Sequence, residues 1–360
     1  MLYQPVHLRD HQQVKSSNNF PASSFVCRPP LGIEDEPDAA AFTESLVPHH
    51  YSLEHGADEP FVTEIKDAVV VTEQSLVFDE KHFYLDSYHN AELMRTILPV
   101  LPIVGPLAKD RLIANFSGLL QHRYDGPAIL IASPHAGNYH HWILETLPRL
   151  WLLDEYPEYR GVPIIFNGSL VPFQNQTLER LLGPDTPILL YGVGASTVSN
   201  LIFPSFLAPG GHSYQQLEWL RSKFLTRVGK RERLIYVSRE DAINGRRIAN
   251  QYEIEECLTG LGFQKVVLSV EKHADQVELF TDARIIIGIS GSGIVNHIFS
   301  PEGAHVIEFH PKDYTNRAYF FTTNLLHQTY QFVICDRDLQ GNLKVPVDRV
   351  LRCVERVLYD

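Results

Sequence analysis

From residue 61 onward, short apolar runs that are typical of buried strands alternate with longer stretches whose apolar residues recur at helical spacing. In the first half, the pattern predicts strands over residues 128–132, 162–166 and 188–191, with a helix over 172–182. Alternation of this kind is typical of an α/β layer whose strands run parallel.

The region before that layer has a different pattern. Three β-rich runs, 68–71, 76–78 and 82–85, are separated by polar turns, which predicts a β-meander. Residues 90–98 are expected to be helical. Residues 1–60, rich in Ser, Asn, Pro and His, are expected to form an extended, partly irregular N-terminal segment.

In the second half of the chain, strand-like and helix-like segments alternate more clearly. Gly and Pro concentrate at 208–212, which predicts a linker before a long helix at 214–228. Strands are then expected over 234–237, 266–269, 284–289, 306–309 and 330–334. Helices are expected over 248–259, 274–282 and 319–326, with a final helix from about Pro346. The pattern therefore predicts an irregular segment (1–60), two α/β domains (61–207 and 208–345) and a C-terminal helix (346–360).

Charge and composition narrow the possible partners and location. The formal net charge of −12 argues against nucleic acid as the main partner, while a small anion in a local basic pocket remains compatible with it. The chain shows no apolar run of about 18 residues and no signal-peptide pattern at residues 1–10. Its four scattered cysteines have no metal-ligand spacing, so reduced thiols in a cytoplasmic protein are expected.

The segment that follows the strand at 128–132 carries candidate chemistry. Pro-His-Ala-Gly-Asn at 134–138 breaks the strand, and Asn138 is a suitable N-cap for a helix. Ile143, Leu147, Leu150 and Trp151 stand at helical spacing and are expected to face the core.

His141, Glu145 and Arg149 follow one another at intervals of four residues and are expected along a neighbouring face of that helix. Pro148 makes the direction of Arg149 less certain, because proline can kink a helix. A base, an acid and a cation after a strand suggest a site at the carboxyl edge of the sheet. An ordinary surface helix with ion pairs remains the alternative.

A second candidate is the Gly/Ser turn in the segment 285–296, where a hydrophobic strand leads into a helix start. Backbone N–H groups at such a turn can bind a diphosphate, aided by the helix dipole. The turn lacks the Lys-Ser/Thr of a Walker loop. A tight connection without a ligand is the alternative.

Basic residues follow the strand at 234–237. Ser238 and Arg239 end this strand, and Arg246 and Arg247 follow shortly afterwards. Arginines at the carboxyl end of a strand can bind phosphates through bidentate contacts. A solvated basic face is the alternative, since Glu240 and Asp241 are adjacent.

An Asp-x-Asp pair, Asp336 and Asp338, follows the strand at 330–334. Such a pair can hold a divalent ion against a diphosphate. A polar turn is the favoured interpretation here, because Leu-Gln-Gly-Asn follows directly.

Together these segments resemble glycosyltransferase family 61. The similarity covers roughly residues 60–335 and rests on four motifs in the same order, at 138–149, 234–239 with Arg246-Arg247, 276–280 and 286–308. One departure concerns the turn, where relatives usually read Gly-x-His-Gly-Ala-Gly. This chain has Ser290 in place of that histidine, and a serine can hydrogen-bond phosphates but cannot carry charge.

The resemblance implies a GT-B fold, with two Rossmann-like domains facing a cleft and the C-terminal helix packing back. It implies inverting transfer of a sugar from a nucleotide-sugar donor to a glycan or lipid-linked saccharide acceptor, with no cofactor and no obligatory metal. The expected location is cytoplasmic, with peripheral association with the inner membrane face left open. The implied donor-binding residues lie in the second half: Ser238, Arg239, Arg246, Ser290, Gly291, Ser292, Gly293, Asn296 and Glu308.

The first half is expected to present the acceptor, with His141 and Glu145 as the catalytic pair. An inverting transfer needs a base for the acceptor hydroxyl, and His141 with Glu145 as its orienting partner suits that role. The opposite assignment stays open. Further acceptor-side residues are Asn138, His140, Trp142 and Arg149. Two other functions remain possible, a sugar-nucleotide epimerase of the same fold and a glycan- or nucleotide-binding protein without catalysis.

Overall fold

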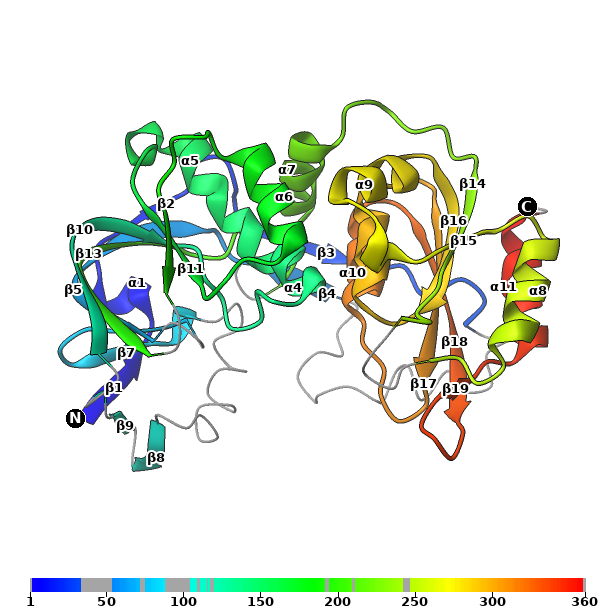
Figure 1. The fold of residues 1–360 in the computed structure, drawn as a ribbon, viewed down its shortest axis with the longest axis horizontal. Helices are drawn as coiled ribbons and strands as arrows, with labels where there is room; N and C mark the ends of the chain where they lie inside the picture. Colours follow the sequence, from blue (N-terminus) through cyan, green and yellow to red (C-terminus); the bar gives the residue numbers. More distant parts are fainter. Residues whose placement is uncertain are drawn as a thin grey trace. The chain divides into compact units, whose positions relative to one another are not determined.

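The computed structural model describes most of the chain, and the described residues are 2–33, 54–71, 75–87, 104–108, 111–114, 116, 120–191, 194–208, 211–241 and 247–358. The chain divides into two compact units (Figure 1). Unit 1 comprises Met1–Ser23 and Gly56–Trp219, and unit 2 comprises Ser24–His55 and Leu220–Asp360. Among the described residues, every helix is too short or too polar to cross a membrane.

Unit 1 is built on a mixed sheet, with 11 strands in the part of the chain that the structure describes. The strand order is β12-β11-β10-β13-β5-β6-β7-β1-β9-β8, and β2 pairs with β5. The strands are β1 (Leu2–Val6), β2 (Val14–Ser16), β5 (Phe61–Val71), β6 (Leu76–Phe78), β7 (His82–Tyr84), β8 (Val104–Ala108), β9 (Arg111–Ala114), β10 (Leu120–Leu130), β11 (Ile164–Asn167), β12 (Ile188–Tyr191) and β13 (Ala195–Pro204). A separate pair joins β3 (Ser23–Val26) to β4 (Glu54–Ala57).

The predicted parallel layer is confirmed in β10, β11 and β12, which pair in parallel. Ala128, Ile129 and Leu130 have no exposed surface, as expected for a parallel strand that is covered on both faces. The predicted meander is also confirmed, because β5, β6 and β7 pair antiparallel in sequence order.

Two parts of unit 1 differ from the sequence prediction. The 10-residue strand β13 was not predicted, although it pairs in parallel with β10 and antiparallel with β5. The first 60 residues are less irregular than expected, because their described part includes β1, β2, β3 and β4. The predicted helix at 90–98 lies outside the described residues.

The helical segments of unit 1 lie between or after its strands along the chain. They are α1 (Leu8–His11), η2 (Leu85–Ser87), α4 (Tyr139–His141), η4 (Trp142–Thr146), η5 (Leu147–Trp151), α5 (Leu152–Glu155), η6 (Pro157–Tyr159) and α6 (Pro172–Leu181). The helix α7 (Tyr214–Phe224) contains the boundary between the units, which falls after Trp219. The segment from α4 to α5 is one continuous helical path that changes from α to π to 3₁₀ and back to α.

Unit 2 has a smaller sheet in the order β15-β14-β16-β17-β18-β19, in which β15 to β18 are parallel and β19 is antiparallel. The strands are β14 (Arg233–Val237), β15 (Gln264–Val266), β16 (Ala283–Ile289), β17 (His305–Pro311), β18 (Thr329–Arg337) and β19 (Leu343–Lys344). The helices are α8 (Gln251–Gly260), η7 (Leu268–Val270), α9 (His273–Thr281), η8 (Ser292–Phe299), α10 (Ala318–Leu325) and α11 (Val347–Leu358). The five parallel strands follow the doubly wound order 2-1-3-4-5.

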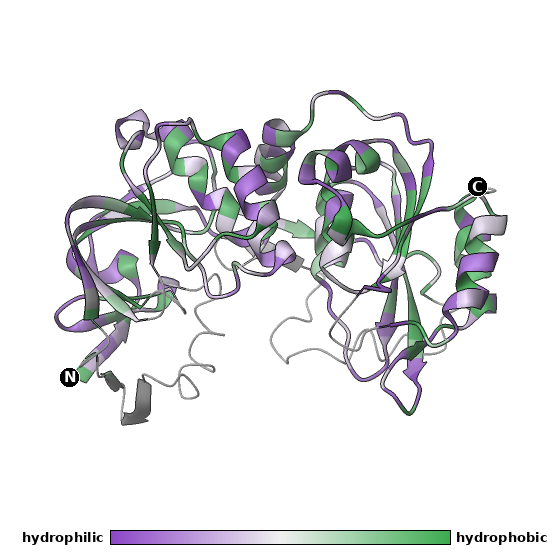
Figure 2. Cartoon of the chain, viewed as in Figure 1, coloured by the Kyte–Doolittle hydropathy of each residue, from purple (hydrophilic) through white to green (hydrophobic). Residues whose placement is uncertain are grey.

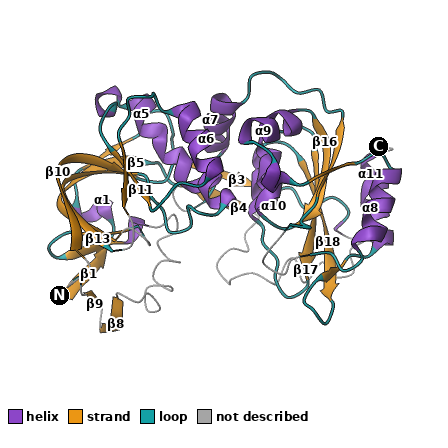
Figure 3. Cartoon of the chain, viewed as in Figure 1, coloured by secondary structure: helices purple, strands orange, loops and turns teal. Residues whose placement is uncertain are grey.

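Helices cover both faces of this sheet. Figure 3 shows α9 and α10 on one side of the strands and α8 and α11 on the other. In Figure 2, α8 and α11 carry both hydrophobic and hydrophilic positions, as expected for helices with one buried face. The predicted stripe of α11 is confirmed at Val350, Val354 and Val357, which pack with Ile287 of β16 in one core.

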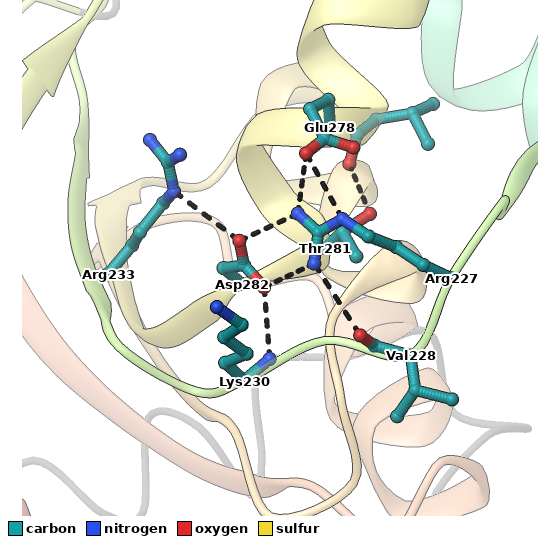
Figure 4. A network of polar contacts seen from close by, with 8 residues as sticks. Arg227, Val228, Lys230, Arg233, Glu278, Thr281 and Asp282 are labelled. Carbon is teal, nitrogen blue, oxygen red and sulfur yellow. Dashed lines mark hydrogen bonds and ion pairs between the residues drawn. The ribbon is translucent and has the colours of Figure 1, made fainter.

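An arginine ties the segment before β14 to the end of α9 (Figure 4). Arg227 donates to both carboxylate oxygens of Asp282 at 2.7 Å and also to Glu278. The backbone N–H of Lys230 donates to Asp282 as well, at 2.9 Å. Hydrogen bonding from Arg227 lowers the pKa of Asp282 to about 2. A Cβ on Gly229 would lie 1.7 Å from the carbonyl oxygen of Thr281, so the backbones approach closely here.

Candidate functional site

The carboxyl ends of β14 and β16 are neighbours in unit 2, and the strand order reverses between them. The register pairs Val237 with Gly288. Arg239 therefore follows one strand, and the turn Ser290-Gly291-Ser292-Gly293 follows the other, at the same edge of the sheet. In open α/β sheets, ligands bind outside the carboxyl ends of the strands at such a switch point.

Arg239 and Gly291 are in direct contact. A Cβ added to Gly291 would lie 1.8 Å from Nη1 and 2.8 Å from Cζ of Arg239. Gly291 has an extended backbone, with φ of 171°, so space rather than backbone conformation favours glycine here. The carbonyl of Gly291 accepts a hydrogen bond from Tyr319 Oη at 3.0 Å. The guanidinium is thus placed against a turn that α10 supports.

A buried polar network lies beneath the turn. Glu308 accepts from Tyr330 Oη at 2.7 Å and lies 3.2 Å from Nε2 of His310, and all three side chains are buried. Burial alone would raise the pKa of Glu308. The charge on His310 and hydrogen bonds from His310, Tyr330 and Ser290 outweigh burial and hold this pKa below its ordinary value. Ser290, in the turn, is therefore hydrogen-bonded to the buried carboxylate of Glu308.

The predicted donor-binding residues divide into a partly exposed set and a buried set. Arg239, Gly291, Ser292 and Gly293 are partly exposed. The buried set, at 4% exposure or less, consists of Ser238, Ser290, Asn296 and Glu308.

The buried residues therefore hold the turn in place and do not form its accessible surface. Asn296, for example, donates to Gln276 Oε1 at 2.9 Å. Gln276, Tyr319 and Tyr330 were not predicted as site residues. Only Gln276 had a signal in the sequence, because it begins the motif at 276–280. Arg246 lies outside the described residues, and Arg247 is exposed.

In unit 1, the helical segment after β10 begins as predicted at Asn138, whose side chain accepts from the His140 N–H at 2.9 Å. Nδ1 of His141 and Oε1 of Glu145 lie 2.8 Å apart. The side chain of His141 is 29% exposed, whereas that of Glu145 is 10% exposed. The interval of four residues therefore predicted the contact that the structure shows, between a partly exposed imidazole and a nearly buried carboxylate.

Two more histidines lie beside this pair. The ring of His135 is 4.9 Å from that of His141, and the ring of His140 is 5.0 Å from it. His135 is exposed and His140 is half-buried. Ligand atoms of His140, His141 and Glu145 all lie within 4.8 Å of one another. Imidazole and carboxylate side chains therefore gather at one end of the helical segment.

The comparison with known families gives one match. Residues 139–307 match the family model described as Glycosyltransferase 61. This region belongs to glycosyltransferase family 61. The resemblance seen in the sequence is confirmed, and the chain is a glycosyltransferase. A search of curated proteins found no match. The matched region of this glycosyltransferase includes His141, Glu145, Arg239 and the Gly/Ser turn, and it ends one residue before Glu308.

Arg149 of the glycosyltransferase lies in the core of unit 1, and its predicted acceptor-side position is corrected. Its guanidinium donates to the carbonyl of Pro204 from Nε (3.0 Å) and Nη2 (2.7 Å), and to that of Ala132 from Nη1 (2.7 Å). It also lies over the rings of Phe203 and Phe206. Complete burial lowers the pKa of Arg149 to about 9, so the side chain is still charged at neutral pH.

This placement fills the switch point of unit 1. The strand order reverses between β10 and β13, and Arg149 bridges the backbone just beyond the carboxyl end of β10 to the last residue of β13. Trp142 is also fully buried, with Nε1 donating to Thr177 at 2.8 Å. Both residues hold the helical segment in position, so of the site residues predicted on this segment His140 and His141 are the ones that combine an ionisable side chain with partial exposure.

Proposed function

We propose that this glycosyltransferase transfers a sugar from a nucleotide-sugar donor to a glycan or lipid-linked saccharide acceptor, with inversion at the anomeric carbon. The observation that carries the proposal is the contact between Arg239 and Gly291 at the switch point of unit 2. A cation packed on a glycine-rich turn at the carboxyl edge of a parallel sheet suits the diphosphate of a nucleotide.

On the donor side, we propose that Arg239 and the backbone N–H groups of the 290–293 turn bind the diphosphate. Guanidinium groups bind phosphate oxygens through two parallel hydrogen bonds. The same contacts would stabilise the negative charge that develops on the leaving nucleotide. The buried Glu308 and Ser290 would act by holding the turn in place.

On the acceptor side, we propose that Glu145 accepts a hydrogen bond from Nδ1–H of His141, so that the proton stays on Nδ1 and Nε2 keeps its lone pair. Nε2 then removes the proton of the acceptor hydroxyl as the oxygen attacks the anomeric carbon. The bond from that carbon to the phosphate oxygen breaks, and the nucleotide diphosphate leaves. Glu145 as the base, with His141 binding the acceptor, is the alternative that variants of both residues distinguish.

The proposal includes a GT-B architecture, which the doubly wound order of unit 2 and the parallel strands of unit 1 support. It also includes transfer without an obligatory metal, because arginine and backbone amides would neutralise the leaving group. Asp338, the candidate ligand near the C-terminus, instead accepts from the backbone of Gln340 and Asn342 in the β18–β19 turn. Full activity is expected in excess EDTA, and activity that returns only with added manganese would contradict metal independence.

A panel of nucleotide sugars, with and without candidate saccharide acceptors, tests the function. We expect nucleotide release from one donor to rise with one acceptor, and the product to have the inverted anomeric configuration by NMR. Conversion of the donor sugar without nucleotide release would identify an epimerase instead. Donor binding without turnover for any acceptor would identify a binding protein.

A further inference from the structure

The histidine cluster of unit 1 offers a second kind of chemistry beside the base that the proposed transfer uses. His140, His141 and Glu145 bring two imidazoles and a carboxylate within 4.8 Å of one another. We propose that these three side chains bind a divalent transition metal of the zinc class, and that the bound metal inhibits transfer.

The type of ligand points to zinc. Two histidines and one glutamate form a donor set that zinc favours, and three protein ligands leave the fourth tetrahedral position to water. With metal–ligand bonds of about 2.0–2.1 Å, the ligand atoms of a tetrahedral site lie about 3.3 Å apart. Nδ1 of His141 and Oε1 of Glu145, at 2.8 Å, need to separate only slightly.

The ring of His140 completes the set. Its ring already lies 5.0 Å from that of His141, and its side chain is half-buried, so the site needs a movement of His140 while the nearly buried Glu145 stays in place. Partial exposure of His140 and His141 gives the ion a path from solvent. Asn138, which caps the first turn of the segment, fixes the backbone that carries both histidines.

Inhibition follows from the two nitrogens of one ring. A metal bound at Nδ1 of His141 takes the lone pair of that nitrogen, and the neutral ring then carries its proton on Nε2. The proposed base needs Nε2 without a proton, so the metal-bound tautomer cannot accept the proton of the acceptor hydroxyl. This second half of the inference rests on the proposed function, whereas the binding site itself does not.

Metal binding is tested first, with protein stripped of metal by EDTA and dialysed. Calorimetric titration with Zn²⁺ is expected to show one site per chain, and Co²⁺ is expected to give the visible absorption of a tetrahedral complex. His140→Ala, His141→Ala and Glu145→Gln are each expected to lower the affinity at least tenfold, because even outer partners of a metal contribute that much.

His122→Ala is the matched control, since His122 is an exposed histidine of the same unit that stacks on Tyr191. It is expected to leave zinc affinity unchanged. Circular dichroism confirms that each variant is folded. A stripped protein that binds no zinc, or binding that survives all three substitutions, overturns the site.

Inhibition is tested by nucleotide release with the active donor and acceptor. Stoichiometric Zn²⁺ is expected to stop release, and EDTA is expected to restore it. Transfer that continues with the site loaded, or that zinc stimulates, overturns the inhibition. If zinc does not bind but His141→Ala abolishes turnover, the inference fails while the proposed function stands.

Discussion

At the residue scale, the contact between Arg239 and Gly291 explains why a glycine stands after β16. The backbone there is extended, a conformation open to any residue, but the guanidinium fills the space that a side chain would occupy. Adding a Cβ would displace the end of a flexible side chain, not a backbone atom. Substitution of Gly291 should therefore change the position of Arg239 without unfolding unit 2.

A double-mutant cycle tests this coupling. Arg239→Ala is expected to weaken nucleotide binding about tenfold or more, because a charge-assisted hydrogen bond contributes about 1.5–3 kcal/mol. Gly291→Ala is expected to cause a similar loss, and the double variant no more than either one. Calorimetry with the nucleotide measures all three.

Gly260→Ala is the matched control, because a Cβ on this glycine of α8 meets no atom within 4 Å. It is expected to leave nucleotide binding unchanged. Strictly additive losses in the cycle would show that Arg239 and Gly291 act separately.

The catalytic pair gives the second residue-scale prediction. His141→Ala is expected to lower turnover by about 10²–10⁴-fold with nearly intact donor affinity, because general base catalysis contributes that much. His140→Ala is expected to lower turnover far less, and His122→Ala not at all. Single-turnover rates and nucleotide affinity measure the two effects separately.

Glu145→Gln distinguishes the two assignments. If Glu145→Gln is inactive while His141→Ala remains active, the carboxylate is the base and the histidine binds the acceptor. Activity in both variants would show that the base lies elsewhere and that this helical segment is structural.

Spacing in the sequence predicted some of these residues and not others. The contact of His141 with Glu145 depends on one turn of local structure, so an interval of four residues sufficed. Arg149, two turns on, contacts carbonyls at Ala132 and Pro204, which no local pattern reveals. Glu308 likewise acts through Tyr330 on the neighbouring strand.

At the element scale, the path from α4 to α5 explains why the four-residue spacing of polar residues fails at Arg149, while Leu147, Leu150 and Trp151 are buried as predicted. The π turn of η4 and the 3₁₀ turns of η5 change the number of residues per turn, so positions four apart no longer share a face. Pro148 within η5 has no N–H to donate to the preceding turn. Arg149 is thereby directed into the core.

Strands were predicted where hydrophobicity was continuous, and missed where it was not. The run 128–132 is apolar throughout, because both faces of that part of the sheet are covered. The first six residues of β13 include Ser196, Thr197, Ser199 and Asn200, and the side chains of Ser199 and Asn200 donate to Asp125 and Glu64 on the adjacent strands. A polar strand of this kind is specified by its partners, which the local sequence does not show.

The contact between Arg227 and Asp282 gives an element-scale prediction. Asp282→Ala is expected to lower the urea midpoint of unfolding, because it removes the carboxylate that holds Arg227 and the Lys230 N–H. The lowered pKa of Asp282 means that its contribution is present above about pH 4 and is lost as pH falls toward about 2.

Glu278→Gln is the matched control for that variant. Its side chain is more than half exposed and accepts from Nε and Nη2 of the same guanidinium through one oxygen, so a smaller effect is expected because solvent screens the pair. Equal midpoints for Asp282→Ala and the unmodified protein would show that the segment before β14 is held by other contacts.

At the scale of the whole molecule, the strand order reverses at one switch point in the sheet of each unit, but different kinds of residue occupy the two switch points. In unit 1 the switch point is filled by Arg149, whereas in unit 2 it presents a glycine-rich turn and Arg239. Two α/β regions could be predicted from the alternation of apolar runs. The membership of the described residues 24–33 in unit 2 could not be predicted, because it depends on long-range contacts such as that of the Leu31 N–H with the carbonyl of Tyr330.

Two buried histidines of unit 2 should make stability depend on pH. Burial lowers the pKa of His273 and of His297 to about 4. In the unfolded chain each titrates near pH 6.5, so the unfolded state binds more protons between these values. Stability is therefore expected to fall as pH decreases from about 6.5 to about 4, by about 1.4 kcal/mol per pH unit for each histidine.

Urea unfolding at a series of pH values, followed by fluorescence, measures this slope. His273→Phe removes one titrating group and keeps an aromatic ring against Phe224 and Phe299, so the slope is expected to halve. His122→Gln changes an exposed histidine and should leave the slope as it is. If the free energy of unfolding instead stays constant between pH 6.5 and 4, both rings take up protons inside the fold as readily as in the unfolded chain. That result would contradict the lowered pKa values, and both ring nitrogens of His297 would then donate to Gln328 and Thr322.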